Sequence, residues 1–247
     1  MTDTDAATTG HSTVEEWTRA LAESKGSPGG GAGTGVMLAI AASLASMVAG
    51  YTEPEDGRQA ELASLHERAQ ALREAALRLA DDDAAASEAF GAAFRLERGP
   101  ERDAAIHRAS VAAAKASAVL GERAVAAIDD LGWLAVHGNP ALIADVVVGF
   151  GALRAAVAGA RTNVSFDLAT LRSAGATLEQ IREQHPDLWS AVEQLTAALE
   201  RIDHHTAAVD GLLHLIGSSA GPFVDHATDD LLYRMCLVFV SRCRRAD

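Results

Sequence analysis

The sequence is poor in aromatic residues and lacks the patterns that mark β-strands. Phe, Trp and Tyr together make up 4% of its 247 residues. Valine and isoleucine form no alternating apolar and polar runs. Hydrophobic residues nevertheless amount to 49%, most of them alanine and leucine, which favour helices and close helix packing. The sequence therefore predicts an all-α fold, a bundle of long helices around a sizeable core.

Positive charge is also scarce. The chain has 21 Lys and Arg residues against 34 Asp and Glu residues, which gives a net charge of −13. An acidic surface repels the phosphates of nucleic acids and the head groups of anionic membranes. We therefore expect neither a nucleic-acid partner nor a membrane partner.

Signals for export and for a membrane span are missing as well. The N-terminus is polar and acidic, unlike a secretory signal. The most apolar stretch, residues 35–50, is too short to cross a bilayer, so we interpret it as a buried core helix. The two cysteines, Cys236 and Cys243, are spaced to share one helical face and are expected to be reduced thiols. These features predict a cytoplasmic protein.

No spacing typical of a metal site or of a nucleophilic triad is present. The nine histidines include no pair separated by three residues, and His204 and His205 are neighbours that point to different faces of a helix. No Gly-x-Ser-x-Gly elbow occurs. The sequence therefore predicts no metal site.

Capping signals divide the chain into helices. Residues 1–12 read as a disordered leader, residues 13–205 as a helical domain, and residues 206–247 as a C-terminal helical extension of that domain. Helix starts are predicted at Thr13, Pro100, Pro140, Thr177 and Pro222. The acidic run at residues 81–83 either continues its helix or interrupts it.

A glycine-rich segment precedes the helix at residues 35–50. It reads Ser27-Pro28-Gly29-Gly30-Gly31-Ala32-Gly33. Glycine frees the backbone, and the unpaired amides at a helix start can hold an anion or a polar ring. A tight turn that lets two helices touch explains the same residues equally well.

Two acidic segments are further candidates. Asp145 follows Gly138-Asn139-Pro140 and lies among aliphatic residues, which suits general acid or base chemistry if the carboxylate is desolvated. A structural ion pair with Arg154 or Arg161 is the favoured alternative. Asp81–Asp83 reads first as a solvated acidic face, or else as one side of a cleft that also contains Arg95.

In chain order these segments resemble the cyclodeaminase/cyclohydrolase family. That family has Pro-Gly-Gly-Gly-Ser before an alanine- and glycine-rich helix, and here Pro28–Ala32 stands in that place. It then has a block that begins Asp-Ala-x-Ala, which Asp83–Ala86 matches. A third block has Gly-Asn and later Ser-Asp-Ala-Gly, then Gly-Ala-x-x-Asn-Val-x-x-Asn-Leu. The matching residues here are Gly138-Asn139, Ala144-Asp145, Gly159-Ala160, Asn163-Val164 and Leu168.

The resemblance implies an enzyme that acts on the one-carbon bridge of a tetrahydrofolate, either methenyl- or formimino-tetrahydrofolate. It implies Asp145, Arg95 and Asp83 as catalytic residues, and a small-molecule substrate with no cofactor. It also implies a homodimer, because the family pairs its subunits. The residues it implies for substrate binding are Pro28, Gly29, Gly30, Gly31, Asn139 and Asn163.

Several positions depart from the family pattern. The loop serine is Ala32, the serine before Asp145 is Ala144, and bulk is added at Val146 and Val147. Later polar positions read Ser165 and Asp167, and Lys-Leu-Pro reads Arg95-Leu96-Glu97. These changes motivate an alternative, a divergent enzyme for cyclisation, elimination or ring-opening of a non-folate metabolite. A non-catalytic helical binding protein is the third hypothesis.

Overall fold

A computed structural model gives the fold of the chain and describes residues 8–24, 26–173 and 177–219. Within these residues all regular structure is helical, as the composition predicts. The helices are α1 (Val14–Leu21), α2 (Gly30–Gly50), α3 (Gln59–Phe94), α4 (Pro100–His137), α5 (Ile143–Ser173), α6 (Leu178–Gln184) and α7 (Pro186–Ser219), with a single 3₁₀ turn, η1 (Pro140–Leu142), before α5.

The predicted helix starts within the described residues are confirmed. Thr13 and Thr177 each form a capping box with the residue three positions later. Pro100 occupies the first turn of α4. The Asn139 side chain accepts a hydrogen bond from the amide of Ala141, but the turn it caps is the 3₁₀ turn η1. The helix predicted from Pro222 lies outside the described residues.

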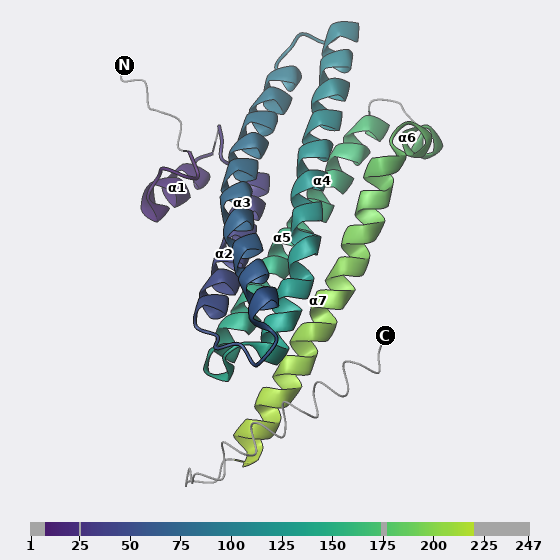
Figure 1. Ribbon diagram of the computed structural model, residues 1–247. Coiled ribbons are helices and arrows are strands. Elements are labelled where there is room, and N and C mark those ends of the chain that lie inside the picture. Colours follow the sequence, from purple (N-terminus) through teal and green to yellow (C-terminus); the bar gives the residue numbers. More distant parts are fainter. Residues whose placement is uncertain (1–7, 25, 174–176, 220–247) are drawn as a thin grey trace.

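Long antiparallel helices form the body of the molecule (Figure 1). Helices α2, α3, α4 and α5 alternate in direction and share one hydrophobic core, to which α7 adds Leu195, Leu199 and Ile202. A second cluster joins α4 and α5 to α6 and α7. At one end, the hairpin of α3 and α4 rises above the start of α2, because α3 continues well past the level at which α2 begins.

Helix α3 runs through the acidic run at residues 81–83 without a break. Two of these carboxylates have partners outside their own helix. Asp81 accepts a hydrogen bond of 2.7 Å from the amide of Thr9, and Asp83 is buried against α2. An acid that is satisfied by tertiary contacts does not compete with the helix backbone, so the helix continues.

The ordered part of the N-terminal segment packs on α3. The Thr9 hydroxyl accepts a hydrogen bond of 3.2 Å from the Trp17 indole, and Trp17 is buried with Ala32 and Ala80. Residues 8–12 therefore form a turn held by α1 and α3, which differs from the disordered leader expected there; residues 1–7 lie outside the described residues. At the other predicted boundary, residues 205–206, helix α7 continues without interruption.

Two described helices are long and apolar enough to cross a bilayer by length and composition alone. They are α2, with 21 residues, and the span Pro140–Arg172, which contains α5. The expectation that the α2 stretch is too short was wrong, because its helix begins at Gly30 and not at Gly35. Core helices of soluble proteins pass the same test, and 56% of the apolar window of α2 is buried inside the bundle, against 33% for α5.

Candidate functional site

The glycine-rich segment places the start of α2 against a carboxylate of α3. A Cβ atom on Gly31 would collide with the Asp83 carboxylate, so only glycine fits at this position. Gly29 is the N-cap and makes no side-chain cap, and a Cβ on Gly30 would meet open space. The Ser27 hydroxyl donates a hydrogen bond of 3.1 Å to the carbonyl of Ala84, which holds the segment to α3. The segment thus brings α2 close to α3 at Gly31 and leaves the backbone beside Gly30 open to space.

Asp83 takes the anion position that the glycine-rich segment offers. The residue is 6% exposed. Burial raises the pKa of its carboxyl, whereas hydrogen bonds from the Ser87 hydroxyl, the Ala32 amide and the Ser117 hydroxyl act in the opposite direction. The start of α2 carries no acidic residue of its own, so its amides and its dipole favour the charged form of this carboxylate.

Asp167 of α5 is the second buried acid of this region. It is 7% exposed, and its pKa is raised to about 7, first by burial and then by the negative charge of Asp83. The sequence comparison counted Asp167 only as a departure from an asparagine. The sequence does not show that Asp167 lies near Asp83, because the two residues come from different helices, α5 and α3, which the fold brings together at the start of α2.

The register between α2 and α5 fixes the position of Asn163. Leu44 lies beside Gly149, and ten residues along each antiparallel helix Thr34 lies beside Gly159. Four residues further on, the same register places the half-buried Asn163 opposite Gly30. The glycine-rich segment, Asp83 and Asn163 are therefore brought together, as the resemblance implies.

Buried polar side chains concentrate at this end of the bundle, which we call the glycine end. Among the described residues, six polar or charged side chains are buried. Five of them lie near the start of α2, in the second halves of α3 and α5, or in the first half of α4. These five are Thr34, Asp83, Ser110, Ser117 and Asp167. Ser110 is fully buried, and its hydroxyl has no hydrogen-bond partner in the described part of the chain.

The sixth buried polar residue, Thr52, lies at the opposite end, together with Asn139. The Thr52 hydroxyl accepts a hydrogen bond of 3.0 Å from the amide of Asn139, and the Asn139 side chain donates one of 3.0 Å to the carbonyl of Tyr51. Tyr51 follows the last residue of α2, whose 21 residues span about 30 Å. Asn139 is thus a structural clasp far from the glycine-rich segment.

Asp145 lies at the same distant end, in the first turn of α5. The expected cleft between the glycine-rich segment and Asp145 is therefore not formed within one chain, because the two features flank opposite ends of α2. The structural alternative with Arg154 does not hold either, since Arg154 pairs with Asp203 at 2.6 Å.

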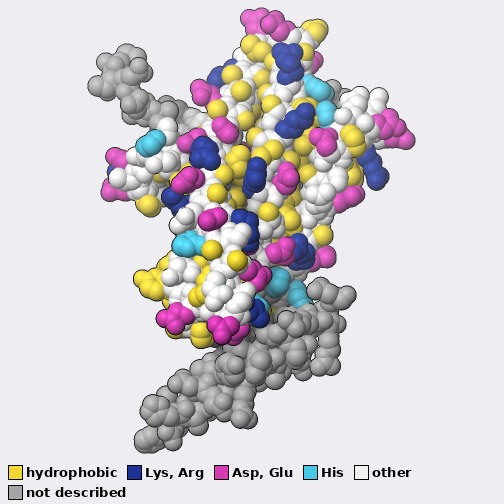
Figure 2. Space-filling view, viewed as in Figure 1, with side chains coloured by type: hydrophobic (Ala, Val, Ile, Leu, Met, Phe, Trp, Pro, Cys, Tyr) yellow, Lys and Arg dark blue, Asp and Glu magenta, His cyan; other side chains and the backbone are white. Residues whose placement is uncertain are grey.

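Arg95 is not brought to the glycine end. It follows the last residue of α3 and is exposed, about 18 Å along the helix from Asp83. Its guanidinium lies beside Gly91, one turn back on the same helix. The charged side chains on the face shown in Figure 2 are mixed in sign and do not form a cationic patch.

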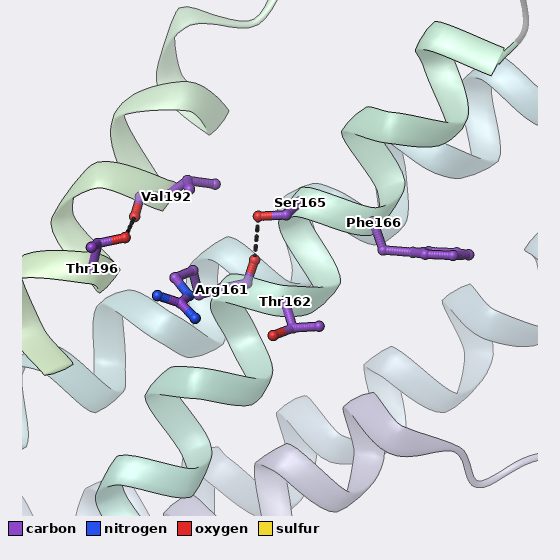
Figure 3. A pocket seen from close by; sticks show the side chains of 6 residues that line it. All are labelled: Arg161, Thr162, Ser165, Phe166, Val192 and Thr196. Atoms are coloured by element: carbon purple, nitrogen blue, oxygen red, sulfur yellow. Dashed lines mark hydrogen bonds between the residues drawn. The ribbon is translucent and has the colours of Figure 1, made fainter.

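A hollow of about 520 Å³ opens between α5 and α7. Figure 3 shows Arg161 and Ser165 on the side of α5 that faces Val192 and Thr196, whereas Phe166 points away from α7. The Ser165 and Thr196 hydroxyls are both used within their own helices, at 2.8 Å each. Neither Asp83 nor Asp167 is among the residues that line this hollow. No group of three potential metal ligands occurs among the described residues.

Comparisons with known proteins support the helical fold. A family model described as formiminotransferase-cyclodeaminase matches residues 13–186, a range that contains every predicted site residue. The structure is similar to the crystal structure of a formiminotetrahydrofolate cyclodeaminase from Thermotoga maritima, with a TM-score of 0.67 and 23% sequence identity. The similarity covers 81% of this chain and 98% of that chain. No curated protein matches the sequence significantly.

Proposed function

This chain belongs to the formiminotransferase-cyclodeaminase family, and on that premise we propose that it cyclises formiminotetrahydrofolate, with Asp83 as its catalytic carboxylate. The observation that carries the proposal is a buried carboxylate held at the start of α2, next to a backbone edge at Gly30 that faces open space. The two other residues predicted to be catalytic lack this setting. Asp145 lies in the first turn of α5, at the opposite end of α2, and Arg95 is exposed just after the end of α3.

Cyclisation of formiminotetrahydrofolate requires a negative charge and a group that transfers a proton beside the formimino carbon. In cyclodeamination, N10 of the folate attacks the cationic formimino carbon and loses its proton. The amino group on that carbon gains a proton and leaves as ammonia, and the methenyl bridge remains with a positive charge. A carboxylate fixed by the amide of Ala32 and the hydroxyl of Ser117 would stabilise the cationic carbon and transfer the proton from N10 to the leaving nitrogen.

Hydrolysis of methenyltetrahydrofolate is the second reaction to test, because water can add to the same cationic carbon. The purified protein should release ammonia and form the methenyl chromophore from formiminotetrahydrofolate, and the same preparation should be assayed for loss of that chromophore from methenyltetrahydrofolate. Turnover of the second substrate alone would make the enzyme a cyclohydrolase. Absence of turnover together with absence of binding for both folates would reject the folate proposal.

The structure weakens the main argument for a non-folate substrate. The Ala32 side chain is fully buried beside Trp17 and Ala80. Replacing the family's serine with alanine at this position therefore does not remove a hydroxyl from an exposed pocket surface. Ala144, Val146 and Val147 lie at the distant end of α5, away from Asp83. A thermal shift with non-folate metabolites and none with folates would support the alternative, and a fold that binds neither would support the non-catalytic hypothesis.

We also propose that the protein is a homodimer paired through α5 and α2. An uncharged stripe with the spacing of a helix seam is exposed along α5, through Ala144, Val148, Gly151, Ala155, Thr162 and Phe166. Phe166 is 62% exposed and Val148 59%, and the adjacent α2 exposes Met37 and Ile40, each at 42%. An apolar surface of this length is typical of an interface between subunits.

Light scattering after size-exclusion chromatography tests the dimer. Ala155→Glu places a charge in the stripe and is expected to give a monomer, whereas Ala197→Glu adds the same charge on the exposed side of α7 and should leave the dimer intact. A wild-type monomer at micromolar concentration would contradict the proposal.

A further inference from the structure

The glycine end contains two buried carboxyl groups, and among the described residues no Lys or Arg forms an ion pair with either of them. Asp83 and Asp167 are 6% and 7% exposed. Neither takes part in any of the ion pairs formed by the described residues. Two carboxylates that share a water-poor site cannot both ionise without a large electrostatic cost, because like charges repel strongly there.

The described residues around Asp167 supply no compensating charge. Helix α2 has no charged residue along its whole length, and from α3 the group that acts on Asp167 is Asp83. On α5 itself, Arg161 and Arg172 are six and five residues away and point to other sides of the helix. Lys115 of α4 acts on His185 instead.

The face that α4 turns toward this pair is uncharged. It consists of Ser110, Ala114 and Ser117, in which Ser117 reaches Asp83 and Ala114 packs against α5. Ser110 lies two turns from Ser117 on this face, fully buried, and its hydroxyl lacks a hydrogen-bond partner within the described chain. Buried polar atoms without a partner are few in native proteins, and the described chain has one other, His185 Nε2. The Ser110 hydroxyl is therefore free to bond to a further polar group.

We propose that Asp83 and Asp167 share a single proton at neutral pH, that Asp83 stays the anion, and that protonated Asp167 positions the substrate by donating a hydrogen bond. Asp83 keeps the charge because the Ala32 amide and the Ser87 and Ser117 hydroxyls donate to it. Among the described residues no comparable donor acts on Asp167, so Asp167 takes the proton, which makes its carboxyl a hydrogen-bond donor. The positioning role rests on the proposed cyclodeaminase function, but the shared proton does not.

The shared proton can be measured without any substrate. In protein labelled with ¹³C-carboxyl aspartate, the resonance that disappears in Asp167→Asn should titrate near neutral pH. The same resonance should titrate at lower pH in Asp83→Asn, because the neighbouring negative charge is gone. A titration midpoint below pH 5 in the wild type would overturn the proposal, whatever the enzyme's activity.

The positioning role predicts an unusual effect of Asp167→Asn on the pH profile. The wild-type kcat/KM for formiminotetrahydrofolate should fall about tenfold for each pH unit above neutrality, as Asp167 loses its proton. The asparagine amide donates at every pH, so the variant should keep activity near the wild-type optimum and lose this decline. Asp167→Leu, which has no donor, should be impaired at all pH values.

Two results would overturn the positioning role. A wild-type profile that is flat from pH 7 to pH 9 would show that the proton is not needed. A loss of more than 100-fold in Asp167→Asn at every pH would show that Asp167 transfers a proton and does not merely donate a hydrogen bond. If neither folate reacts while the ¹³C titration is near neutral, the shared proton stands and the proposed substrate fails.

Discussion

Both ends of α2 contain buried polar side chains, but the two sets of side chains differ in how far their hydrogen bonds and charges are satisfied within the protein. At the Thr52 end, the polar groups satisfy one another: Asn139 caps η1 and ties it to Tyr51 and Thr52. At the glycine end, an aspartate is buried against backbone amides, a second aspartate has no cation, and a buried serine lacks a partner. Polar groups whose hydrogen bonds are satisfied within the protein stabilise the fold, whereas buried polar groups that lack partners indicate a candidate binding site.

The comparison is tested most strongly by removing one acid from each end. Asp83→Asn should lower kcat for cyclodeamination by 100-fold or more, a typical loss for a catalytic acid or base. Asp145→Asn should retain most of the activity, because Asp145 lies about 30 Å away along α2.

Asp82→Asn is the matched control, since it removes an exposed charge from the residue next to Asp83. Equal activity of Asp83→Asn and the wild type in a steady-state assay would remove Asp83 from the mechanism. An inactive, folded Asp145→Asn in a dimer would mean that the partner subunit brings the distant end to the site.

A methyl group at the glycine end should disturb the fold more than one placed a single residue earlier. In Gly31→Ala the new Cβ would occupy the position of the Asp83 carboxylate, and we expect a loss of about 2–3 kcal/mol in the free energy of unfolding. Gly30→Ala faces open space and should cost nothing. Urea unfolding measures both, and equal stability of the two variants would refute the close contact.

The raised pKa of Asp167 predicts a pH-dependent stability. In the folded protein this pKa is about 7, against 3.8 for an ordinary aspartate in the unfolded chain, so between these pH values the folded state keeps a proton that the unfolded state releases. The contribution of this carboxyl to stability is therefore complete below pH 4 and is lost as the pH rises toward 7.

Asparagine does not ionise, so Asp167→Asn should gain stability relative to the wild type by about 2 kcal/mol between pH 4 and pH 8. This is roughly half of the full shift, because residual solvent screens the charge. Chemical unfolding at pH 4, 6 and 8 gives the difference, with Asp82→Asn as a control that should show no such trend.

The smallest effect is expected at the Thr52 end. Thr52→Val removes the acceptor for the Asn139 amide and should cost about 1 kcal/mol, without an effect on kcat. Thr206→Val is the control, because the Thr206 hydroxyl bonds only to Ile202 within its own helix. A drop in kcat in Thr52→Val would connect the two ends and weaken the distinction between them.

Local sequence signals predicted much of the fold. The cap at Thr13, the capping box at Thr177, the proline at the start of α4 and the Asn139 cap are all predictable, because a cap depends on residues within one turn. The course of the chain through Asp83 was left open, since the partners that satisfy this acid come from other helices. The first turn at Pro140 was recognised as a start, but its 3₁₀ form was not.

The candidate site was predictable only in part. Asp83 and Gly31 were both named from the sequence, and the structure joins them because no other residue type than glycine lets the carboxylate approach. Asp167 was missed, since its raised pKa depends on a residue 84 positions earlier in the chain. Asp145 is predicted from the sequence to be catalytic, but the structure places it at the far end of α2 from the glycine-rich segment.

The sequence by itself determined the helical class, most helix starts and the family, because these depend on composition, on short-range capping and on ordered motifs. Only the tertiary structure decided which motifs meet. Antiparallel packing carries Asp83 and Asp167 to the start of α2 and leaves Asn139 and Asp145 at its far end, since a rigid helix of 21 residues holds its two ends about 30 Å apart.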